Sequence, residues 1–372
     1  MKKKRIVFVA NSSWSILKFR KKILEHLIFK EYDVFVYAPP DQSVQKLIAI
    51  GCKYRELFLS RKGLNPFVDF LTFLNLVFFY FLDRPAFAFH YTVKPNIWGT
   101  IAAKMVCVPS VAVVTGLGHV FIKQNPLTRV VSGLYKLAFM FPREVWFLND
   151  DDLNEFLCRK IVGKVKTRVL PGEGIDLSEF VVCREGPSDP TFLMVSRMLW
   201  DKGVREYVEA AKAVKRKRID VKFQLLGPID DGNPAAVPIE QIRAWSQLGI
   251  IEYLGYADDV RPYMRGCTAV VLPSYREGVP LTLLEASAIG RPLIASNVPG
   301  CRTVVDDGEN GFLVKARSGE ELAAAIEKIL SFSRSDWSFF ANNARQKVEQ
   351  IFEIKEVIKQ YDDVLEFMSV KG

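Results

Sequence analysis

Short apolar runs alternate with helical segments along almost the whole chain, and this alternation restricts the fold more than any other feature of the sequence. Apolar runs that end in turn residues and are followed by helical periodicity are typical of doubly wound α/β proteins. We therefore predict two Rossmann-like domains facing across a cleft. The predicted strands are residues 5–10, 33–38, 86–91, 110–114 and 145–148 in the first half, and residues 191–196, 221–226, 251–254, 269–272 and 293–295 in the second.

Glycine and proline concentrate between residues 171 and 190, which predicts a domain boundary in this segment. A chain of 372 residues is longer than one hydrophobic core usually serves, and its 49% hydrophobic content leaves enough apolar surface for two cores. The predicted division is an N-terminal domain of residues 1–170, a C-terminal domain of residues 171–353, and a last helix of residues 354–372.

Positive charge is concentrated in the first half of the chain. Residues 1–170 hold 26 Lys and Arg against 12 Asp and Glu, and the remaining residues hold 25 against 30, so the halves carry +14 and −5. A basic half indicates an anionic partner, either lipid with a lipid diphosphate or nucleic acid. Two aromatic segments, residues 64–82 and 129–143, favour lipid because each suits a helix lying at a bilayer interface. Ordinary core packing of both helices is the alternative, and the apolar stretch of residues 76–82 is too short and too interrupted to span a bilayer.

Cysteine and histidine give no sign of a metal centre. The six cysteines show neither CxxC pairs nor metal-ligand spacing, and the chain contains three histidines. No signal-type apolar stretch follows the first residues, so a reducing cytosol fits best. The segment Asp150-Asp151-Asp152 contains an Asp-x-Asp pattern that could suggest manganese, but its place between a strand and a helix favours helix capping. We therefore expect activity without a metal or another cofactor.

Two glutamates eight positions apart, Glu277 and Glu285, flank the predicted start of a helix after strand 269–272. Pro280 suits a first helical position, and a glycine and a proline follow the helix. Backbone N–H groups at such a start can donate to a phosphate, and the carboxylates can accept from sugar or ribose hydroxyls. Alternatively, the glutamates only complement the helix dipole. The segment that would contact the ligand is Gly278, Val279, Pro280, Leu281 and Thr282.

A second cluster lies about eighty residues upstream, where strand 191–196 leads into Arg197 and Lys202 and then into a helix. Two cations at a helix N-terminus form an anion site that suits a diphosphate better than a single carboxylate. The alternative is that these are ordinary basic residues in a surface loop. The helix itself is amphipathic, with apolar residues at i, i+3, i+4 and i+7: Val204, Tyr207, Val208 and Ala211.

Taken together, these motifs resemble glycosyltransferase family 4. The likeness rests on Arg-x4-Lys-Gly at residues 197–203, Leu-Pro-Ser-x-x-Glu-Gly-x-Pro-x-x-x-x-Glu-Ala at 272–286, Val-Pro-Gly at 298–300, Asp-Gly-Glu-Asn-Gly-Phe-Leu-Val at 307–314 and Leu-Pro-Gly-Glu-Gly-Ile-Asp at 170–176. Within the family, the chain is most similar to bacterial transferases that add N-acetylgalactosamine to an undecaprenyl-diphosphate-linked sugar. That likeness lies in Phe19-Arg20, Leu64-Asn65-Pro66-Phe67, Gly116-Leu117-Gly118 and Leu134-Tyr135-Lys136-Leu137.

The resemblance implies a role for each cluster and a GT-B fold. Arg197 and Lys202 would hold the donor diphosphate, Glu277 and the following backbone the donor sugar, and Glu285 the ribose. The C-terminal domain would thus bind a UDP-sugar, and the N-terminal domain would bind the acceptor and face the membrane. The last helix would cross back to the N-terminal domain.

The acceptor side is predicted from the carboxyl ends of the N-terminal strands, where ligands of such sheets bind. The candidate acceptor contacts are Arg20, Lys94, Asn96, Gly116 and Gly118, with His119 as a further catalytic candidate. Two of them have a plain alternative: a solvated basic helix face for Arg20, and helix capping for Asn96. Many members of the family have a histidine near position 115 or 116, and this chain departs there, which leaves the role of His119 open.

The resemblance implies a retaining transferase that moves a sugar, most simply an N-acetylhexosamine such as GalNAc, from a UDP-sugar to a polyprenyl-diphosphate-linked saccharide in cell-surface polysaccharide or glycan assembly. Attack would occur on the front face of the donor, and Arg197 and Lys202 would stabilise the leaving diphosphate. We expect a cytoplasmic protein, peripheral at the anionic inner leaflet of the plasma membrane, with no nucleic-acid partner. A nucleotide-sugar epimerase or phosphorylase of the same fold and a non-catalytic nucleic-acid-binding protein are the alternatives.

Overall fold

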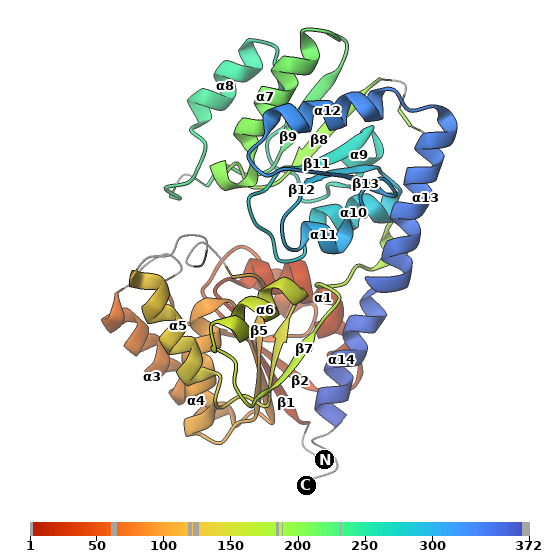
Figure 1. The fold of residues 1–372 in the computed structure, drawn as a ribbon. Coiled ribbons are helices and arrows are strands. Elements are labelled where there is room, and N and C mark those ends of the chain that lie inside the picture. The colour runs from red at the N-terminus through yellow and green to blue at the C-terminus, as the bar shows by residue number, and fades with distance from the viewer. Residues whose placement is uncertain are drawn as a thin grey trace. The chain divides into compact units, whose positions relative to one another are not determined.

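The chain divides into two compact units in a computed structural model that describes residues 3–60, 65–117, 121, 126–183, 186–187, 189–230 and 232–366. The N-terminal unit comprises Met1–Glu173 and Lys355–Gly372, and the C-terminal unit comprises Gly174–Ile354 (Figure 1). The change of unit at Glu173 lies inside the segment that is rich in glycine and proline. The last helix belongs to the N-terminal unit, although the C-terminal unit precedes it in sequence.

The N-terminal unit is built on a seven-stranded sheet in which all pairs are parallel, in the order β3-β2-β1-β4-β5-β6-β7. Successive strands are added outward from β1 in one direction and then from β4 in the other. The switch point therefore lies between β1 and β4, where ligands of doubly wound sheets bind. The strands are β1 (Arg5–Val9), β2 (Asp33–Ala38), β3 (Lys53–Glu56), β4 (Phe87–Tyr91), β5 (Ser110–Val114), β6 (Glu144–Phe147) and β7 (Lys166–Val169).

Helices cover both faces of this sheet, and the strand residues alternate between them. Val7 and Val9 of β1 pack in one core with Leu76 and Tyr80. Phe8, between them, contacts the ring of Tyr361 on the opposite face. The helical elements are α1 (Ser13–Phe29), α2 (Val44–Ala49), α3 (Pro66–Asp83), the π-helical η1 (Pro95–Gly99), α4 (Thr100–Met105), α5 (Pro126–Ala138), α6 (Asp150–Cys158) and α14 (Ile354–Glu366).

The C-terminal unit repeats the same winding on a six-stranded parallel sheet with the order β10-β9-β8-β11-β12-β13. Its switch point lies between β8 and β11, so the connections that follow these two strands meet at one edge of the sheet. The strands are β8 (Thr191–Val195), β9 (Lys222–Leu226), β10 (Glu252–Tyr253), β11 (Ala269–Leu272), β12 (Leu293–Ser296) and β13 (Gly311–Val314).

The helices of the C-terminal unit also form two layers. Residues of α7, α8 and α12 pack with Phe192 and Met194 of β8 in one large core, which includes the predicted apolar positions of α7. Helices α9, α10 and α13 pack against one another and cover the other face (Figure 1). The helical elements are η3 (Leu177–Glu179), η4 (Trp200–Lys202), α7 (Val204–Lys215), α8 (Ile239–Gln247), α9 (Arg261–Arg265), α10 (Leu281–Ile289), α11 (Cys301–Val304), α12 (Gly319–Leu330) and α13 (Arg334–Ile351).

Two helix starts differ from the prediction by one residue. Pro280 is the N-cap of α10 with an extended ψ of 114°, and the helix begins at Leu281. The N-cap of α6 is Asn149, whose side chain accepts from the N–H of Asp152, so the three aspartates lie in the first turn and complement the helix dipole. Within the described ranges, no group of three or more His, Cys, Asp or Glu side chains is placed to hold a metal.

Helix α3 is longer and more continuous than the sequence suggested. Its 18 residues have a mean hydropathy of 1.5, so by length and composition alone it could cross a membrane, and it is the helix among the described residues that meets this test. About a fifth of it, 22%, is buried inside the fold. The buried face is anchored by Tyr80, whose hydroxyl lies 2.7 Å from His90 Nε2, and by Asp83, which binds Arg55. The prediction that the apolar stretch of residues 76–82 does not span a bilayer stays a prediction, because length and composition alone do not decide it.

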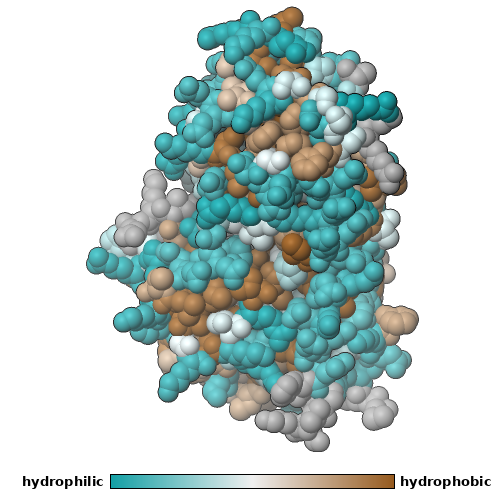
Figure 2. Space-filling view, turned by 45° about the vertical axis from the view of Figure 1, so that its right-hand side comes forward, coloured by the Kyte–Doolittle hydropathy of each residue, from teal (hydrophilic) through white to brown (hydrophobic). Residues whose placement is uncertain are grey.

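The outward face of α3 is unusually apolar for a protein surface. The five side chains along it are between 45% and 68% exposed, and they follow the helical spacing: Phe67, Phe70, Leu74, Phe78 and Phe81. Figure 2 shows hydrophobic residues gathered on the surface of the N-terminal unit, in the lower half of the view. Large contiguous apolar patches on a protein surface usually mark a site that binds a protein, a membrane or a ligand.

Candidate functional site

Two connections at the switch point of the C-terminal sheet carry the predicted donor residues. One runs from β8 through η4 into α7, and the other runs from β11 to α10. They are joined by a hydrogen bond of 2.9 Å from the backbone N–H of Tyr275 to the carbonyl of Asp201. Gly203 has a φ of +82°, and a Cβ added there would lie 2.1 Å from the carbonyl oxygen of Pro273. Only glycine allows the two connections to approach this closely.

Lys202 and Glu277, 75 positions apart in sequence, meet at this edge. The Nζ atom of Lys202 donates to Oε1 of Glu277 over 2.6 Å, and the two side chains are only 18% and 12% exposed. Burial raises the pKa of the nearby Cys301 thiol well above its ordinary value, and the charge of Glu277 adds to the effect, which favours the neutral thiol. The sequence predicted that both charged residues face the donor, and the structure brings them together as a pair.

Arg197 lies at the outer side of the same edge. Its guanidinium is 3.5 Å from a carboxylate oxygen of Asp230, and about half of its side chain is exposed to solvent. An exposed ion pair of this kind contributes little to stability. Arg197 can therefore exchange Asp230 for an anionic ligand at small cost.

The sequence predicts that residues 278–282 at the start of α10 donate backbone hydrogen bonds to the ligand, and one of them cannot do so. Pro280 has no N–H group, and its ring instead fixes the entry into the helix. The hydroxyl of Thr282 donates to the carbonyl of Val195 over 3.2 Å, which ties the first turn of α10 to the end of β8. The loop residues Gly278 and Val279 precede this turn, and a Cβ on Gly300 would lie 1.8 Å from the Gly278 carbonyl oxygen, so the connection after β12 supports the loop.

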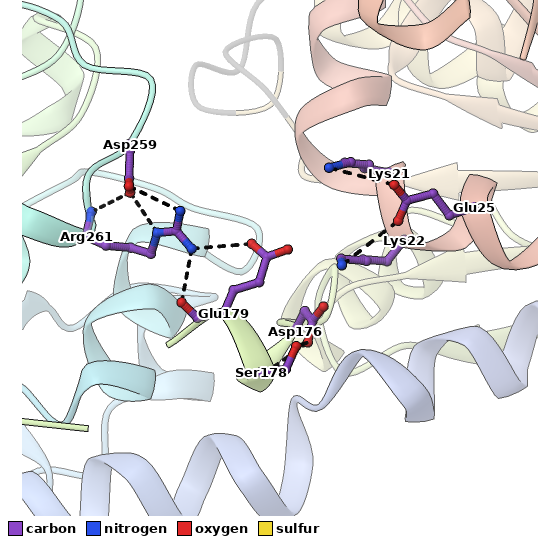
Figure 3. A network of polar contacts seen from close by, with 8 residues as sticks. All are labelled: Lys21, Lys22, Glu25, Asp176, Ser178, Glu179, Asp259 and Arg261. Carbon is purple, nitrogen blue, oxygen red and sulfur yellow. Dashed lines mark hydrogen bonds and ion pairs between the residues drawn. The ribbon is translucent and has the colours of Figure 1, made fainter. Parts of the chain in front are cut away.

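Glu285 is one turn into α10 and is 7% exposed. The charge of Glu285 contributes to raising the pKa of Arg261, after the larger effect of the Asp259 hydrogen bonds, so the two side chains are electrostatic neighbours. Arg261 is held by Asp259 and Glu179 (Figure 3): its Nε donates to the Asp259 carboxylate over 2.8 Å, and its Nη1 donates to the Glu179 carbonyl over 3.0 Å. Arg261 is a fixed cation near the predicted ribose contact that the sequence reading did not single out.

The structure gives Arg20 a different environment from the one predicted. This side chain on α1 is 2% exposed, its Nη2 atom lies 2.5 Å from Oε1 of Glu173, and its guanidinium stacks 4.1 Å from the centre of the Tyr91 ring. The basic face of α1 is instead formed by Lys21 and Lys22, whose ammonium groups lie 3.7 and 4.0 Å from Glu25 (Figure 3). The prediction that Arg20 contacts the acceptor conflicts with this burial, since a partnered, enclosed guanidinium is not open to a ligand.

Asn96 is also enclosed, which conflicts with its predicted contact to the acceptor. It is fully buried in η1, and its amide donates to the carbonyl of Val113 over 2.9 Å. Lys94, which precedes η1, is more accessible, and its Nζ atom is held 2.5 Å from Asp69 of α3. Gly116 follows β5 with a φ of +136°, a backbone conformation that suits glycine. Gly118 and His119 lie outside the described residues, so their predicted roles stay predictions.

Thr92 lies directly after β4 at the switch point of the N-terminal sheet, in a loop that the strand pattern predicts on the acceptor side, although nothing in the sequence marks its conformation. Its φ is +69°, a left-handed conformation that is a genuine outlier for a β-branched residue. Its Oγ1 atom is buried, and no hydrogen bond to it is found among the described residues. Strained residues of this kind cluster at functional sites, which makes Thr92 a candidate for the acceptor side.

Comparison with known proteins agrees with this arrangement. A family model described as "Glycosyl transferases group 1" matches residues 189–331. The N,N'-diacetylbacillosaminyl-diphospho-undecaprenol alpha-1,3-N-acetylgalactosaminyltransferase of Campylobacter jejuni is 31% identical, over 97% of this chain and 99% of its own. The UDP-Gal:alpha-D-GlcNAc-diphosphoundecaprenol alpha-1,3-galactosyltransferase of Escherichia coli is 25% identical, over 73% of this chain and 72% of its own.

Among solved structures, Anabaena HepE in complex with UDP and glucose superposes with a TM-score of 0.80 at 19% sequence identity, over 98% of this chain and 99% of HepE. The predicted GT-B fold, with its two parallel-sheet α/β domains, is thereby confirmed. The match over nearly the full length of the Campylobacter enzyme confirms the predicted sugar-transfer chemistry as well. This chain belongs to the group 1 glycosyltransferase family and is a glycosyltransferase.

Proposed function

We propose that this enzyme transfers an N-acetylhexosamine, with GalNAc as the first candidate, from a UDP-sugar to a polyprenyl-diphosphate-linked saccharide in the assembly of a cell-surface polysaccharide or glycan. The observation that carries the proposal is the Lys202–Glu277 pair, 2.6 Å apart and held between two connections at the switch point. A cation for a diphosphate and a carboxylate for sugar hydroxyls then lie side by side. The names of the two relatives, one a GalNAc transferase and both acting on diphospho-undecaprenol acceptors, support this substrate class.

In the proposed reaction, donor binding rearranges the charged pair. The diphosphate takes over Lys202 as its counter-ion and displaces Asp230 from Arg197, and Glu277 becomes free to accept hydrogen bonds from the sugar. The bond between donor C1 and the phosphate oxygen breaks, and the acceptor oxygen bonds to C1 on the same face, which retains the configuration. The acceptor proton passes to the leaving phosphate oxygen, so the step needs no protein base. Lys202, Arg197 and the N–H groups at the start of α10 stabilise the negative charge that develops.

The donor and stereochemistry can be tested in one assay. Purified protein is incubated with a polyprenyl-diphosphate-linked N-acetylglucosamine and, in separate reactions, with UDP-GalNAc, UDP-GlcNAc, UDP-galactose and GDP-mannose. We expect transfer from UDP-GalNAc, an α linkage by NMR, and unchanged turnover in EDTA. Transfer from the GDP-sugar alone would overturn the donor assignment, a β linkage would overturn retention, and loss in EDTA with recovery in manganese would overturn the metal-free reaction.

We also propose that the N-terminal unit docks on an anionic membrane surface through the outward face of α3. The apolar stripe from Phe67 to Phe81 would enter the acyl boundary, as expected for an amphipathic interfacial helix. The N-terminal unit, which contains α3, holds 29 Lys and Arg against 17 Asp and Glu, a net charge of +12. The C-terminal unit carries a net charge of −3. A basic unit is drawn to anionic lipid, where a polyprenyl-diphosphate acceptor would also reside.

Vesicle sedimentation separates the apolar and electrostatic contributions. We expect binding to vesicles that contain phosphatidylglycerol, weaker binding to pure phosphatidylcholine, and loss of binding in the double variant Phe67→Ser/Phe78→Ser. The matched control is Phe339→Ser, which removes a similarly exposed aromatic from the C-terminal unit and leaves binding intact. Equal binding by the double variant and the wild type would reject α3 as the docking helix.

A further inference from the structure

A second concave site lies on the C-terminal unit, separate from the donor residues described above. It is an open hollow of about 620 Å³ and is lined by Trp200, Arg205, Glu206, Glu209, Tyr275 and Arg317. These residues come from η4, α7, the connection after β11 and the segment before α12. Neither Lys202 nor Glu277 lines it. The volume falls in the range of small-molecule sites.

The inner wall contains a carboxylate with unused hydrogen-bonding capacity. Glu206 is 5% exposed, and its Oε1 atom accepts from the hydroxyl of Tyr275 over 2.7 Å. Its Oε2 atom is buried, and among the described residues it has no hydrogen-bond partner. A buried carboxylate oxygen without a donor costs free energy, so such an atom points to a donor that a ligand brings.

Two aromatic rings and two guanidiniums form the rest of the wall. Arg205 lies 5.1 Å from the ring centre of Trp200, and Arg317 lies 4.5 Å from that of Tyr275. Arg317 reaches this position with a φ of +64°, a left-handed conformation that is uncommon outside glycine. Arg205, Glu209 and Arg317 are exposed at the rim, and within the described part of the chain neither arginine makes a hydrogen bond or ion pair.

The mixture of donors and acceptors decides the class of ligand. A phosphate is an anion and would be repelled by Glu206 and Glu209. An amine only donates and would be repelled by Arg205 and Arg317. A purely apolar ligand would leave the buried Oε2 atom of Glu206 without a donor. A sugar hydroxyl both donates and accepts, and the C–H face of a sugar ring can lie on an aromatic ring.

We propose that this hollow is a second saccharide-binding site that takes a neutral sugar residue. Hydroxyl groups of the sugar would donate to Glu206 and Glu209 and accept from Arg205 and Arg317, while the ring rests against Trp200 or Tyr275. The site does not depend on the identity of the donor nucleotide or of the acceptor lipid. This proposal can therefore be tested, and rejected, independently of the proposed function.

Ligand-observed NMR by saturation transfer tests the site, with excess UDP present to occupy the donor residues. The probes are free N-acetylgalactosamine and glucose, with inorganic phosphate and putrescine compared by calorimetry. We expect saturation transfer to at least one sugar and no measurable heat with phosphate or putrescine. The proposal is overturned if neither sugar receives saturation, or if phosphate or putrescine binds and the sugars do not.

Arg317→Gly is the decisive variant because glycine accepts the positive φ without strain, so the fold should be kept. It removes one guanidinium from the rim, and we expect sugar binding to weaken about tenfold or more, as when a charged hydrogen-bond partner is lost. Arg205→Met should weaken binding similarly. The control is Arg218→Met, whose guanidinium pairs with Asp220 elsewhere on this unit. Unchanged sugar affinity in both Arg317→Gly and Arg205→Met would place the bound sugar elsewhere and reject the hollow.

Discussion

The buried pair of Arg20 and Glu173 gives the sharpest test of how the N-terminal unit is held together. Arg20→Met removes a guanidinium that is 2% exposed and leaves Glu173 as a buried carboxylate without its ion-pair partner. Breaking a buried pair by removing one partner costs about 3–5 kcal/mol, because the remaining charge stays desolvated. Arg20 also stacks 4.1 Å from the Tyr91 ring, so the upper part of this range is expected.

The size of the effect makes it easy to measure. For a unit of this length each kcal/mol lowers the unfolding midpoint by about 2–4 °C, so a loss of about 4–5 kcal/mol in Arg20→Met should lower it by about 8–20 °C. Hydrogen exchange followed by mass spectrometry localises the loss. Peptides from α1 and α14 should exchange faster, because Tyr91 also bonds Tyr361 of α14 over 2.8 Å. Peptides from the C-terminal unit serve as an internal control and should not change.

Two further variants separate the loss of the ion pair from other effects. Arg20→Met/Glu173→Gln should recover part of the lost stability, since no lone buried charge remains. Lys21→Met removes an exposed charge 3.7 Å from Glu25 in the same helix and should change stability by less than about 1 kcal/mol. If Arg20→Met unfolds like the wild type but raises KM for the acceptor, the structural role of Arg20 is refuted and the role predicted from sequence is restored.

Three other predictions concern the donor site and acid stability. Lys202→Met should lower kcat/KM by tens to hundreds of fold, because about 1.5–3 kcal/mol of charged hydrogen bonding is lost. Lys217→Met, which removes an exposed pair with Glu327, should leave kcat/KM unchanged in the same steady-state assay. Gly203→Ala should abolish UDP-sugar binding by calorimetry because its Cβ would meet the Pro273 carbonyl, whereas Gly249→Ala, with a similar φ but open space, should keep it. Asp83 is pulled toward a raised pKa by burial, but hydrogen bonds from Arg55 and Tyr37 outweigh this and lower its pKa. Because the pKa of Asp83 is lower in the folded than in the unfolded chain, its carboxylate stabilises the fold above the unfolded pKa. This stabilisation is lost as pH falls through the folded pKa. The urea midpoint should therefore drop below about pH 4, and it should drop less steeply in Asp83→Asn.

The sequence was most informative where burial is complete. Every central strand of both sheets was predicted within one or two residues, because strands covered on both faces read as apolar runs. The strands missed are β3, β7 and β13, which lie at sheet edges. The segments Lys-Tyr-Arg-Glu in β3 and Lys-Thr-Arg-Val in β7 carry charge because one side of an edge strand faces solvent. Strand β13 was overlooked because its four residues follow a turn directly.

Side-chain partners set the limit of what the sequence could reveal about the site. The family motifs placed Lys202 and Glu277 at one edge, but that they bind each other depends on two connections 75 residues apart. The burial of Arg20 likewise depends on Glu173, 153 positions away, and no local pattern separates a buried arginine from a solvated one. The backbone strain at Thr92 has no sequence signature, because threonine is not expected to adopt a positive φ.

The two units wind their sheets in the same order but differ in the chemistry at and around the switch point. In the C-terminal unit, glycines draw two connections together around a lysine and a glutamate, which suits a compact, charged donor. In the N-terminal unit, the corresponding edge holds a strained Thr92, with Lys94 nearby, on a basic unit that exposes an aromatic helix. One topology thus provides two ligand edges, and their difference matches the two substrates proposed: a soluble nucleotide sugar for one unit and a membrane-held diphosphate for the other. Because the strand order alone does not distinguish the units, this assignment depends on the residues at each edge, and exchanging their charges should abolish transfer without altering either sheet.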